Sequence, residues 1–239
     1  MVAAANARAS GRRRMPVLLV AVVAAACGAP ATFTGVVRNG LLETNRELVG
    51  PDEVRVVRPG VGPMTPPPLH LQKGDELTTG RSTEVLLRFV RSYALVRPNT
   101  RVAISSLFLH GPGPLTDDEA PPARADTPAD DDQSGSVLVN TRGKFRLHAD
   151  LAEALVEGTR YAFRVDAVAD SRLRVFAGSV RLRSTTGAWP DVRVGAGEQA
   201  EVRGTAPPVK RALIGEERAT LDTAFEAFDR LIDLGGGAF

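Results

Sequence analysis

Hydrophobic and polar residues alternate over short stretches of the chain, and turn residues separate these stretches. In residues 161–166 (YAFRVD), every second side chain is large and apolar, which is the pattern of a strand with one face in a core. Similar strand-like runs lie at residues 84–93, 93–104, 136–141, 143–149, 173–176, 179–183, 192–194 and 199–203. Short strands at this spacing predict an all-β fold, namely an antiparallel β-sandwich or roll of many short strands.

A helical period occurs near the carboxyl end of the chain. Glu216 and Glu217 suit the positive amino end of a helix, and the glycines at 235–237 are expected to terminate it. Between them, apolar side chains recur every three or four positions and form one stripe, which consists of Leu221, Ala224, Phe225, Phe228, Leu231 and Ile232. The pattern predicts a C-terminal amphipathic helix that docks on the β domain or on a partner.

The amino-terminal region has the pattern of a signal peptide or anchor helix. Residues 1–14 form a basic n-region, and the twelve residues that follow (MPVLLVAVVAAA) carry no charge. The segment Ala24–Cys27 resembles a bacterial lipobox, with Ala24 where that motif usually has leucine, and the resemblance implies lipidation of Cys27. Two alternatives stay open: an uncleaved membrane helix over residues 15–37, and soluble export after cleavage. All three predict that everything beyond residue 40 is exported, facing the periplasm or the extracellular side.

Composition divides the remaining chain into segments. Residues 38–68 are predicted to be a spacer and a proline-rich linker, because prolines cannot donate to a strand ladder. Residues 69–204 hold most of the strand-like runs and are predicted to form the β domain. Inside them, residues 109–135 contain seven acids, one arginine and five prolines, so we expect an acidic excursion from the core. Residues 205–239 form a tail that includes the helix.

The charge balance does not indicate nucleic acid binding. Lys and Arg total 30 against 28 Asp and Glu, which gives a formal net charge of +2. Four arginines lie in residues 1–14, which contain no acid, and the other arginines are dispersed among acids. The excess of positive charge therefore belongs to the leader, and we expect no nucleic acid partner.

Candidate catalytic and metal-binding groups are few. One cysteine excludes a disulfide framework or a cysteine-built zinc site, and the three histidines lie far apart in the sequence. Asp130, Asp132 and Ser134 place oxygens at positions 1, 3 and 5 of a calcium-loop pattern. Position 12 would be Thr141 instead of a glutamate, so a solvated acidic loop is the simpler interpretation. We expect a non-enzymatic protein that needs no cofactor.

Several segments resemble the FecR domain, and they occur in the order of that family across residues 69–204. Residues 71–80 (LQKGDELTTG) resemble its opening motif G-D-x-I-x-T-G, and a strand at 84–89 follows. The other segments are 96–102 (VRPNTRV), 158–165 (GTRYAFRV), 175–180 (VFAGSV) and 194–199 (VGAGEQ). Tight turns need a positive φ, which we expect from four glycines in these segments: Gly74, Gly158, Gly178 and Gly197.

The resemblance implies an extracytoplasmic β domain, best known from regulators that relay a receptor signal to a sigma factor. Fourteen residues before the apolar stretch are too few for a sigma-binding domain. We therefore expect a stand-alone, membrane-anchored FecR-like module that binds an envelope protein or a cell-wall component in envelope signalling or assembly. The alternatives are a cell-wall- or glycan-binding lipoprotein and an exported hydrolase, for which no set of nucleophile, base and orienting residue is evident.

Overall fold

The structure is a computed structural model and describes residues 31–104, 123–126, 135–166 and 170–235. Most of the expected leader, including Cys27, lies outside these residues. The three candidate calcium ligands, Asp130, Asp132 and Ser134, also lie outside them. The predictions of a lipidation site and of a calcium loop therefore stay predictions.

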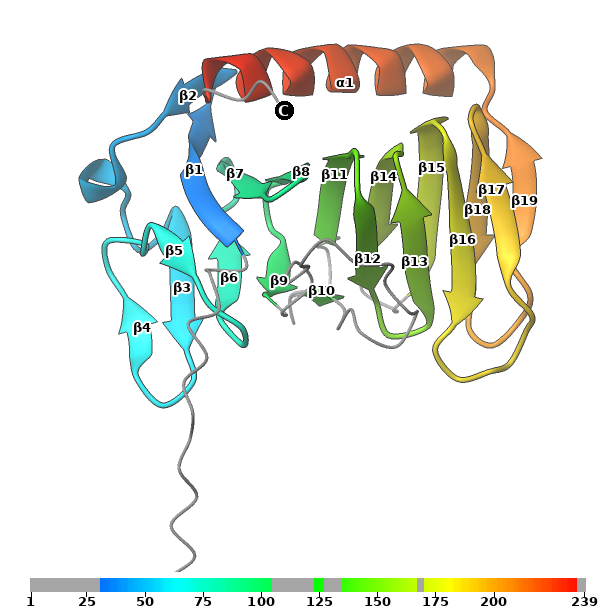
Figure 1. Cartoon of the computed structure of the whole chain (residues 1–239), viewed down its shortest axis with the longest axis horizontal. Helices are drawn as coiled ribbons and strands as arrows, with labels where there is room; N and C mark the ends of the chain where they lie inside the picture. Colours follow the sequence, from blue (N-terminus) through cyan, green and yellow to red (C-terminus); the bar gives the residue numbers. More distant parts are fainter. Residues whose placement is uncertain (1–30, 105–122, 127–134, 167–169, 236–239) are drawn as a thin grey trace, which may run out of the picture.

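The strands of the described residues form two sheets (Figure 1). Sheet A has ten strands: β19 (Val209–Ala212), β18 (Glu198–Val202), β15 (Ser171–Ala177), β14 (Arg160–Val165), β11 (Gly135–Thr141), β8 (Ser92–Val96), β7 (Glu84–Phe89), β1 (Ala31–Arg38) and β2 (Leu41–Glu43) in this order, with β5 (His70–Leu71) also paired to β1. Sheet B has nine strands in the order β17 (Val192–Gly195), β16 (Ser179–Ser184), β13 (Ala152–Glu157), β12 (Lys144–His148), β10 (Ala123–Asp126), β9 (Arg101–Ala103), β6 (Glu76–Thr79), β3 (Val54–Arg58) and β4 (Gly62–Met64).

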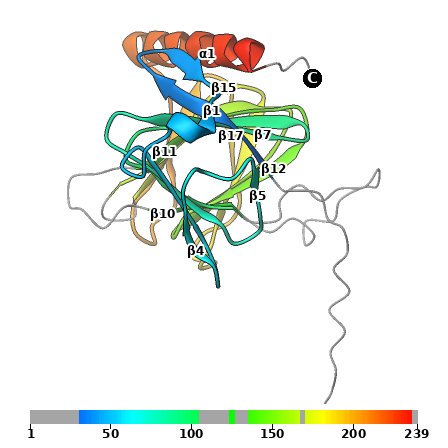
Figure 2. The same ribbon diagram turned by 90° about the vertical axis from the view of Figure 1, so that its left-hand side faces the viewer.

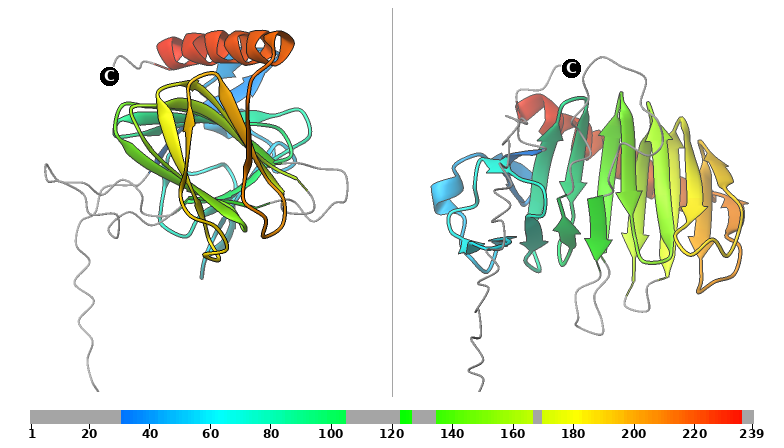
Figure 3. Two further views of the ribbon diagram at one scale, coloured as in Figure 1. Left: turned by 90° about the vertical axis from the view of Figure 1, so that its right-hand side faces the viewer. Right: turned by 60° about the horizontal axis from the view of Figure 1, so that its bottom comes forward.

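The chain builds the two sheets in alternation, one strand or one hairpin at a time. For example, β7 and β8 pair in sheet A, β9 and β10 lie in sheet B, and β11 returns to sheet A beside β8. The paired strands are antiparallel, except that β10 and β12 are parallel. Figure 3 (left) views the stack from its end, with the strands arranged around a common interior. The prediction of a mainly antiparallel β-sandwich is confirmed.

The core between the sheets consists of the alternating apolar residues. Tyr161, Phe163 and Val165 of β14 are each at most 1% exposed, as the alternation predicts. Phe89 of sheet A meets Phe145 of sheet B edge to face, with ring centroids 5.5 Å apart. Such a pair contributes about 0.5–1.5 kcal/mol beyond the burial of its area. The two inner faces therefore make direct contact.

A second apolar cluster lies on the outer face of sheet A, where α1 (Gly215–Leu234) packs. The helix runs across the strands, as Figures 1 and 2 show. The predicted stripe is buried there, with Ala224 only half-buried, and its sheet partners are Val37, Leu86, Tyr93, Leu95 and Leu138. The helix ends at Leu234, where the N–H of Gly235 donates to the Leu231 carbonyl at 2.9 Å. The predicted C-terminal amphipathic helix is thus confirmed, and it docks on its own β domain.

The boundaries expected for the anchor and the linker are wrong. Residues 31–37 belong to β1, between β2 and β7, so a membrane helix over residues 15–37 cannot continue past residue 30. Residues 38–68 are not a spacer and linker, because they contain β2, β3, β4 and the 3-10 helix η1 (Arg46–Leu48). Pro63 fits into β4 because that strand is an edge of sheet B, where one side of the backbone needs no donor.

The acidic segment 109–135 also contributes to the sheets. Within it, β10 pairs with β9 and β12 in sheet B, and Gly135 begins β11. Strand pairing uses backbone groups, so a sequence with few apolar side chains can still add a strand to a sheet. The other residues of this segment lie outside the described ranges.

The substitution Tyr161→Phe is expected to stabilise the protein. The hydroxyl of Tyr161 is buried in the core and has no hydrogen-bond partner within the described part of the chain. Burial raises the pKa of this phenol well above its ordinary value, so the group stays protonated. Burying a hydroxyl without a partner costs about 1–3 kcal/mol, so we expect a gain of about 1 kcal/mol in the free energy of unfolding. Urea denaturation of both proteins measures it, and a lower stability of the variant would contradict an unpaired hydroxyl.

Candidate functional site

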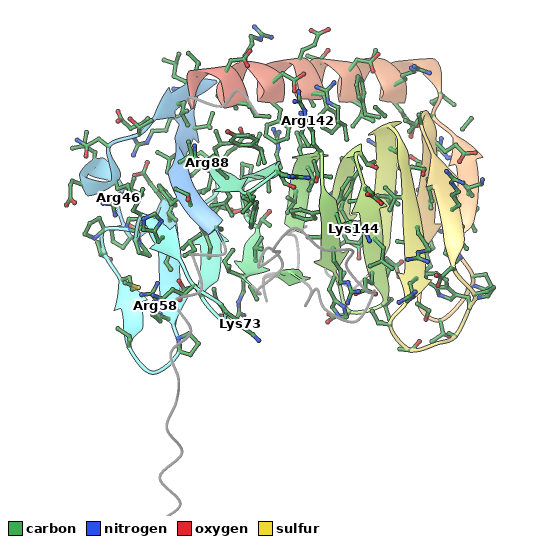
Figure 4. The ribbon with its side chains drawn as sticks, in the orientation of Figure 1. Arg46, Arg58, Lys73, Arg88, Arg142 and Lys144 are labelled. Carbon is green, nitrogen blue, oxygen red and sulfur yellow. The ribbon has the colours of Figure 1, made fainter. Side chains whose placement is uncertain are left out.

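In the motif residues Gly74-Asp75, the buried carboxylate of Asp75 forms an ion pair with Arg58 of a neighbouring strand. In the register of β3 and β6, Val57 faces Glu76, which brings Arg58 next to Asp75. The Nε and Nη2 atoms of Arg58 donate to the two carboxylate oxygens at 2.8 and 2.7 Å, and the Gln72 N–H donates to one of them at 2.7 Å. Asp75 is 0% exposed, and Arg58 lies at the end of β3 in Figure 4. The pair holds the turn before β6 against β3.

The end of the same motif, Thr79-Gly80, closes the opposite end of β6. Thr79 Oγ1 donates to the Arg97 carbonyl at 2.7 Å and accepts from the Thr100 N–H at 2.9 Å. A side chain at position 80 would place its Cβ 2.3 Å from the Asp52 carbonyl oxygen. These residues fix loops to strands, so their part in the fold is structural.

The four predicted turn glycines occupy backbone conformations that side chains disfavour. Their φ angles are +89° at Gly74, +62° at Gly158, +81° at Gly178 and +76° at Gly197. At Gly178 a Cβ would also lie 2.9 Å from the Gly158 carbonyl oxygen. The tight turn between β15 and β16 therefore requires glycine for its backbone angles and for its space.

The AGEQ segment makes a turn through the side chain of Glu198. Its carboxylate accepts the Gly195 N–H at 2.7 Å and lies 3.2 Å from Lys210 Nζ. The hydrogen bond from Gly195 is the main reason that the pKa of Glu198 is lowered. The neighbouring Gln199 is fully buried and connects Arg174 with Glu201, at 3.2 and 3.1 Å. Because it accepts a backbone N–H of the turn, the carboxylate of Glu198 caps this turn.

Polar contacts fix both halves of α1 to sheet A. Near its start, Glu217 accepts from Arg211 at 2.6 and 2.7 Å and from Arg174 at 3.4 Å. Farther along, Asp229 pairs with Arg160 and accepts from Asn140 at 3.2 Å. These contacts flank the apolar stripe and set the direction in which the helix crosses the sheet.

We expect the Glu217 carboxyl to titrate near pH 2. Its pKa is lowered from 4.5 to about 2, chiefly by the hydrogen bonds from Arg211. Because this pKa is lower in the folded state, its contribution to stability is present above pH 4.5 and is lost as the pH falls toward 2. Arg211→Gln should return the pKa of Glu217 toward 4.5 in a carboxyl-carbon NMR titration. Arg218→Gln is the control, and a value near 4.5 in the unmodified protein would contradict the pairing.

A charged hollow lies at one end of sheet A, where β14, β15 and β18 meet. Its volume is about 270 Å³, and its lining includes Arg164, Arg172, Arg203, Asp166, Asp170 and Glu201. Arg164 and Arg172 face each other directly on adjacent strands. Like charges in this arrangement destabilise a sheet unless something balances them.

The three acids of the hollow are occupied by other groups of the protein. Glu201 lies 3.0 Å from Arg172 and 2.9 Å from Arg203. Asp166 accepts the Asp170 N–H at 3.0 Å, and Asp170 accepts the Gly204 N–H at 3.2 Å. Arg164 is exposed and makes no hydrogen bond or ion pair within the described part of the chain. Among the described residues, Arg164 is therefore the arginine of the hollow that has no carboxylate within ion-pair distance.

The sequence pattern gives no sign of this hollow. Arg164 and Arg172 occupy the polar positions of two alternating strands, which assigns them to the outer face of sheet A but not to each other. Their proximity follows from the register between β14 and β15. Alternation alone carries no information about register.

Two kinds of feature are absent from the described residues. They contain no group of three or more histidine, cysteine and acidic side chains arranged to hold a metal ion. In the same residues, no helix combines the length and the apolar character that crossing a bilayer requires.

Two crystal structures are among the solved structures to which this chain is similar. Both are crystal structures of a "putative anti-sigma factor" from Parabacteroides distasonis, with sequence identities of 12% and 11% and TM-scores of 0.44. The match covers 59% of this chain and 61% of each of those chains, so it spans less than two thirds of their length. No protein-family model matches this chain, and no curated protein matches its sequence.

Proposed function

We propose that this protein is an exported, membrane-tethered, non-enzymatic FecR-like module that binds a protein of the cell envelope. One observation supports this most directly: the residues that resemble the FecR motifs form the turns and the buried Arg58–Asp75 pair of a β-sandwich. Motif residues in these places specify a scaffold and supply no reactive group.

The edge strands of sheet A are the proposed contact surface. Strand β2 ends the sheet on one side and β19 on the other, and all four residues of β19 are exposed. Leu41 on β2 is 71% exposed and Val209 on β19 is 69% exposed. An extended segment of a partner can pair with such an edge through backbone hydrogen bonds. The exposed side chain of Leu41 or Val209 can then make an apolar contact with that segment.

Photo-crosslinking in cells tests the partner. A photoreactive amino acid at position 209 should give a specific crosslink to an envelope protein, because this position lies on the free edge of sheet A. The matched control is position 61, a valine in the turn between β3 and β4 that is 71% exposed. Equal crosslinks from both positions would contradict binding at β19. Retention on purified peptidoglycan without a protein crosslink would favour the alternative of a cell-wall- or glycan-binding lipoprotein.

The anchor and the absence of catalysis have separate tests. Mass spectrometry of the mature amino terminus should find a lipidated Cys27, whereas an intact leader or an unmodified terminus would contradict the lipid anchor. Esterase, glycosidase and peptidase assays on the purified protein should give no turnover. Turnover in any of them would favour the alternative of an exported hydrolase.

A further inference from the structure

We propose that the hollow between β14, β15 and β18 is a binding site for an oxyanion, either a phosphate or a carboxylate group of a ligand. The site consists of the guanidinium of Arg164 together with that of Arg172. It is independent of the proposed function, because it depends only on the side chains of this surface.

The charges around the hollow favour the binding of an anion. Arg172 shares Glu201 with Arg203, so two cations already compete for one carboxylate. Arg164 stands opposite Arg172 on one side and opposite Ser136 on the other, and neither residue offers it a negative charge. An anion between the two guanidinium groups would offset the like-charge contact of Arg164 with Arg172.

The surroundings of the site carry more positive charge. Arg174 lies one outward-facing position from Arg172 along β15. Burial is the main reason that the pKa of Arg174 is lowered; Glu217 opposes this shift, and the charges of Arg172, Arg211 and Arg164 add to it. Four arginines thus influence one another on this part of sheet A. Arginine suits the role, because its planar guanidinium can donate two parallel hydrogen bonds to phosphate or carboxylate.

The volume of the hollow limits the size of the ligand group that it can hold. A volume of about 270 Å³ is just below the range usual for small-molecule pockets. It accommodates a single phosphate or a carboxylate with a short attached group. The rest of any larger ligand would lie on the open surface of the sheet.

Titration of the full chain at constant ionic strength tests the site. The probes are inorganic phosphate in one arm and N-acetylglutamate in the other, and NMR of the arginine Nε–Hε groups reports the binding. We expect saturable shifts of the Arg164 resonance with at least one probe, and the arm that binds more tightly identifies the type of oxyanion. Linear, unsaturated shifts with both probes would overturn the proposal.

Matched variants distinguish specific binding of the anion in the hollow from nonspecific attraction of the anion to positive charge on the surface. Arg164→Gln should weaken binding at least tenfold without a change in melting temperature, because its side chain is exposed. Arg88→Gln should change binding less than twofold. Arg88 is an exposed arginine of β7, several strands away from the hollow in sheet A (Figure 4). Glu201→Gln should strengthen binding, because it frees Arg172. Equal losses from Arg164→Gln and Arg88→Gln, or no loss from Arg164→Gln, would overturn the proposal.

Discussion

Replacement of Phe225 by alanine should lower the free energy of unfolding by about 3–5 kcal/mol, the usual cost of removing a buried phenylalanine side chain. Phe225 is 0% exposed and lies in the middle of the contact between α1 and sheet A. Its ring is 5.0 Å from that of Phe176 and 6.1 Å from that of Phe228, and Arg160 lies over it at 5.4 Å. The truncation removes these contacts and leaves a cavity between helix and sheet.

Chemical denaturation measures this loss, and amide hydrogen exchange locates it. Faster exchange should appear in α1 and in β7 and β8, which lie beneath it, before the inner core opens. Leu234→Ala is the matched control, because this residue belongs to the same helix but is 66% exposed. We expect the control to change stability by less than about 0.5 kcal/mol. Equal effects of the two substitutions would contradict the docking of α1.

Replacement of Asp75 by alanine should destabilise the protein by a similar amount, about 3–5 kcal/mol. The reason is electrostatic, because the substitution leaves the Arg58 guanidinium, only 18% exposed, without its counter-charge. It also removes the acceptor for the Gln72 N–H. Urea unfolding of the variant measures the effect.

The neighbouring residue supplies the control for Asp75. Glu76 pairs with Arg101, but the two side chains are 38% and 43% exposed. An ion pair in water contributes about 0–1 kcal/mol, so Glu76→Ala should have a small effect. A loss at position 75 no greater than that at position 76 would show that burial of the Arg58–Asp75 pair does not matter for stability.

The helix and most strands could be predicted because their periods are visible in the sequence. The alternation is least regular in residues 84–96, and the structure gives the reason. Leu86, Tyr93 and Leu95 face α1 instead of water, so β7 and β8 are buried on both faces over most of their length. Alternation of apolar and polar residues indicates a strand with one buried face, so it does not identify a strand that is buried on both faces.

The first strands could not be predicted for two different reasons. The apolar residues of β1 continue directly from the apolar leader, so no change of composition marks Ala31 as the start of a strand. Strand β4 is hidden by its glycine and proline, which an edge strand tolerates. In both cases pairing with another strand decides the structure, and composition does not record that pairing.

The candidate sites depend on the register between paired strands. The motif predicted a turn at Gly74 but gave no sign that Asp75 would pair with Arg58, 17 residues earlier. The partner follows only from the register of β3 and β6. The same holds for Arg164 and Arg172, which become neighbours through the register of β14 and β15.

The position of α1 has a consequence for biosynthesis. The ribosome makes the amino-terminal strands first, whereas Leu231 and Ile232 emerge only after all the described strands of both sheets. Throughout that interval the apolar outer surface of sheet A around Val37, Leu86 and Leu95 is not covered by α1. A nascent or prematurely terminated chain therefore presents a ready substrate for chaperones and quality-control proteases, which the finished protein no longer offers.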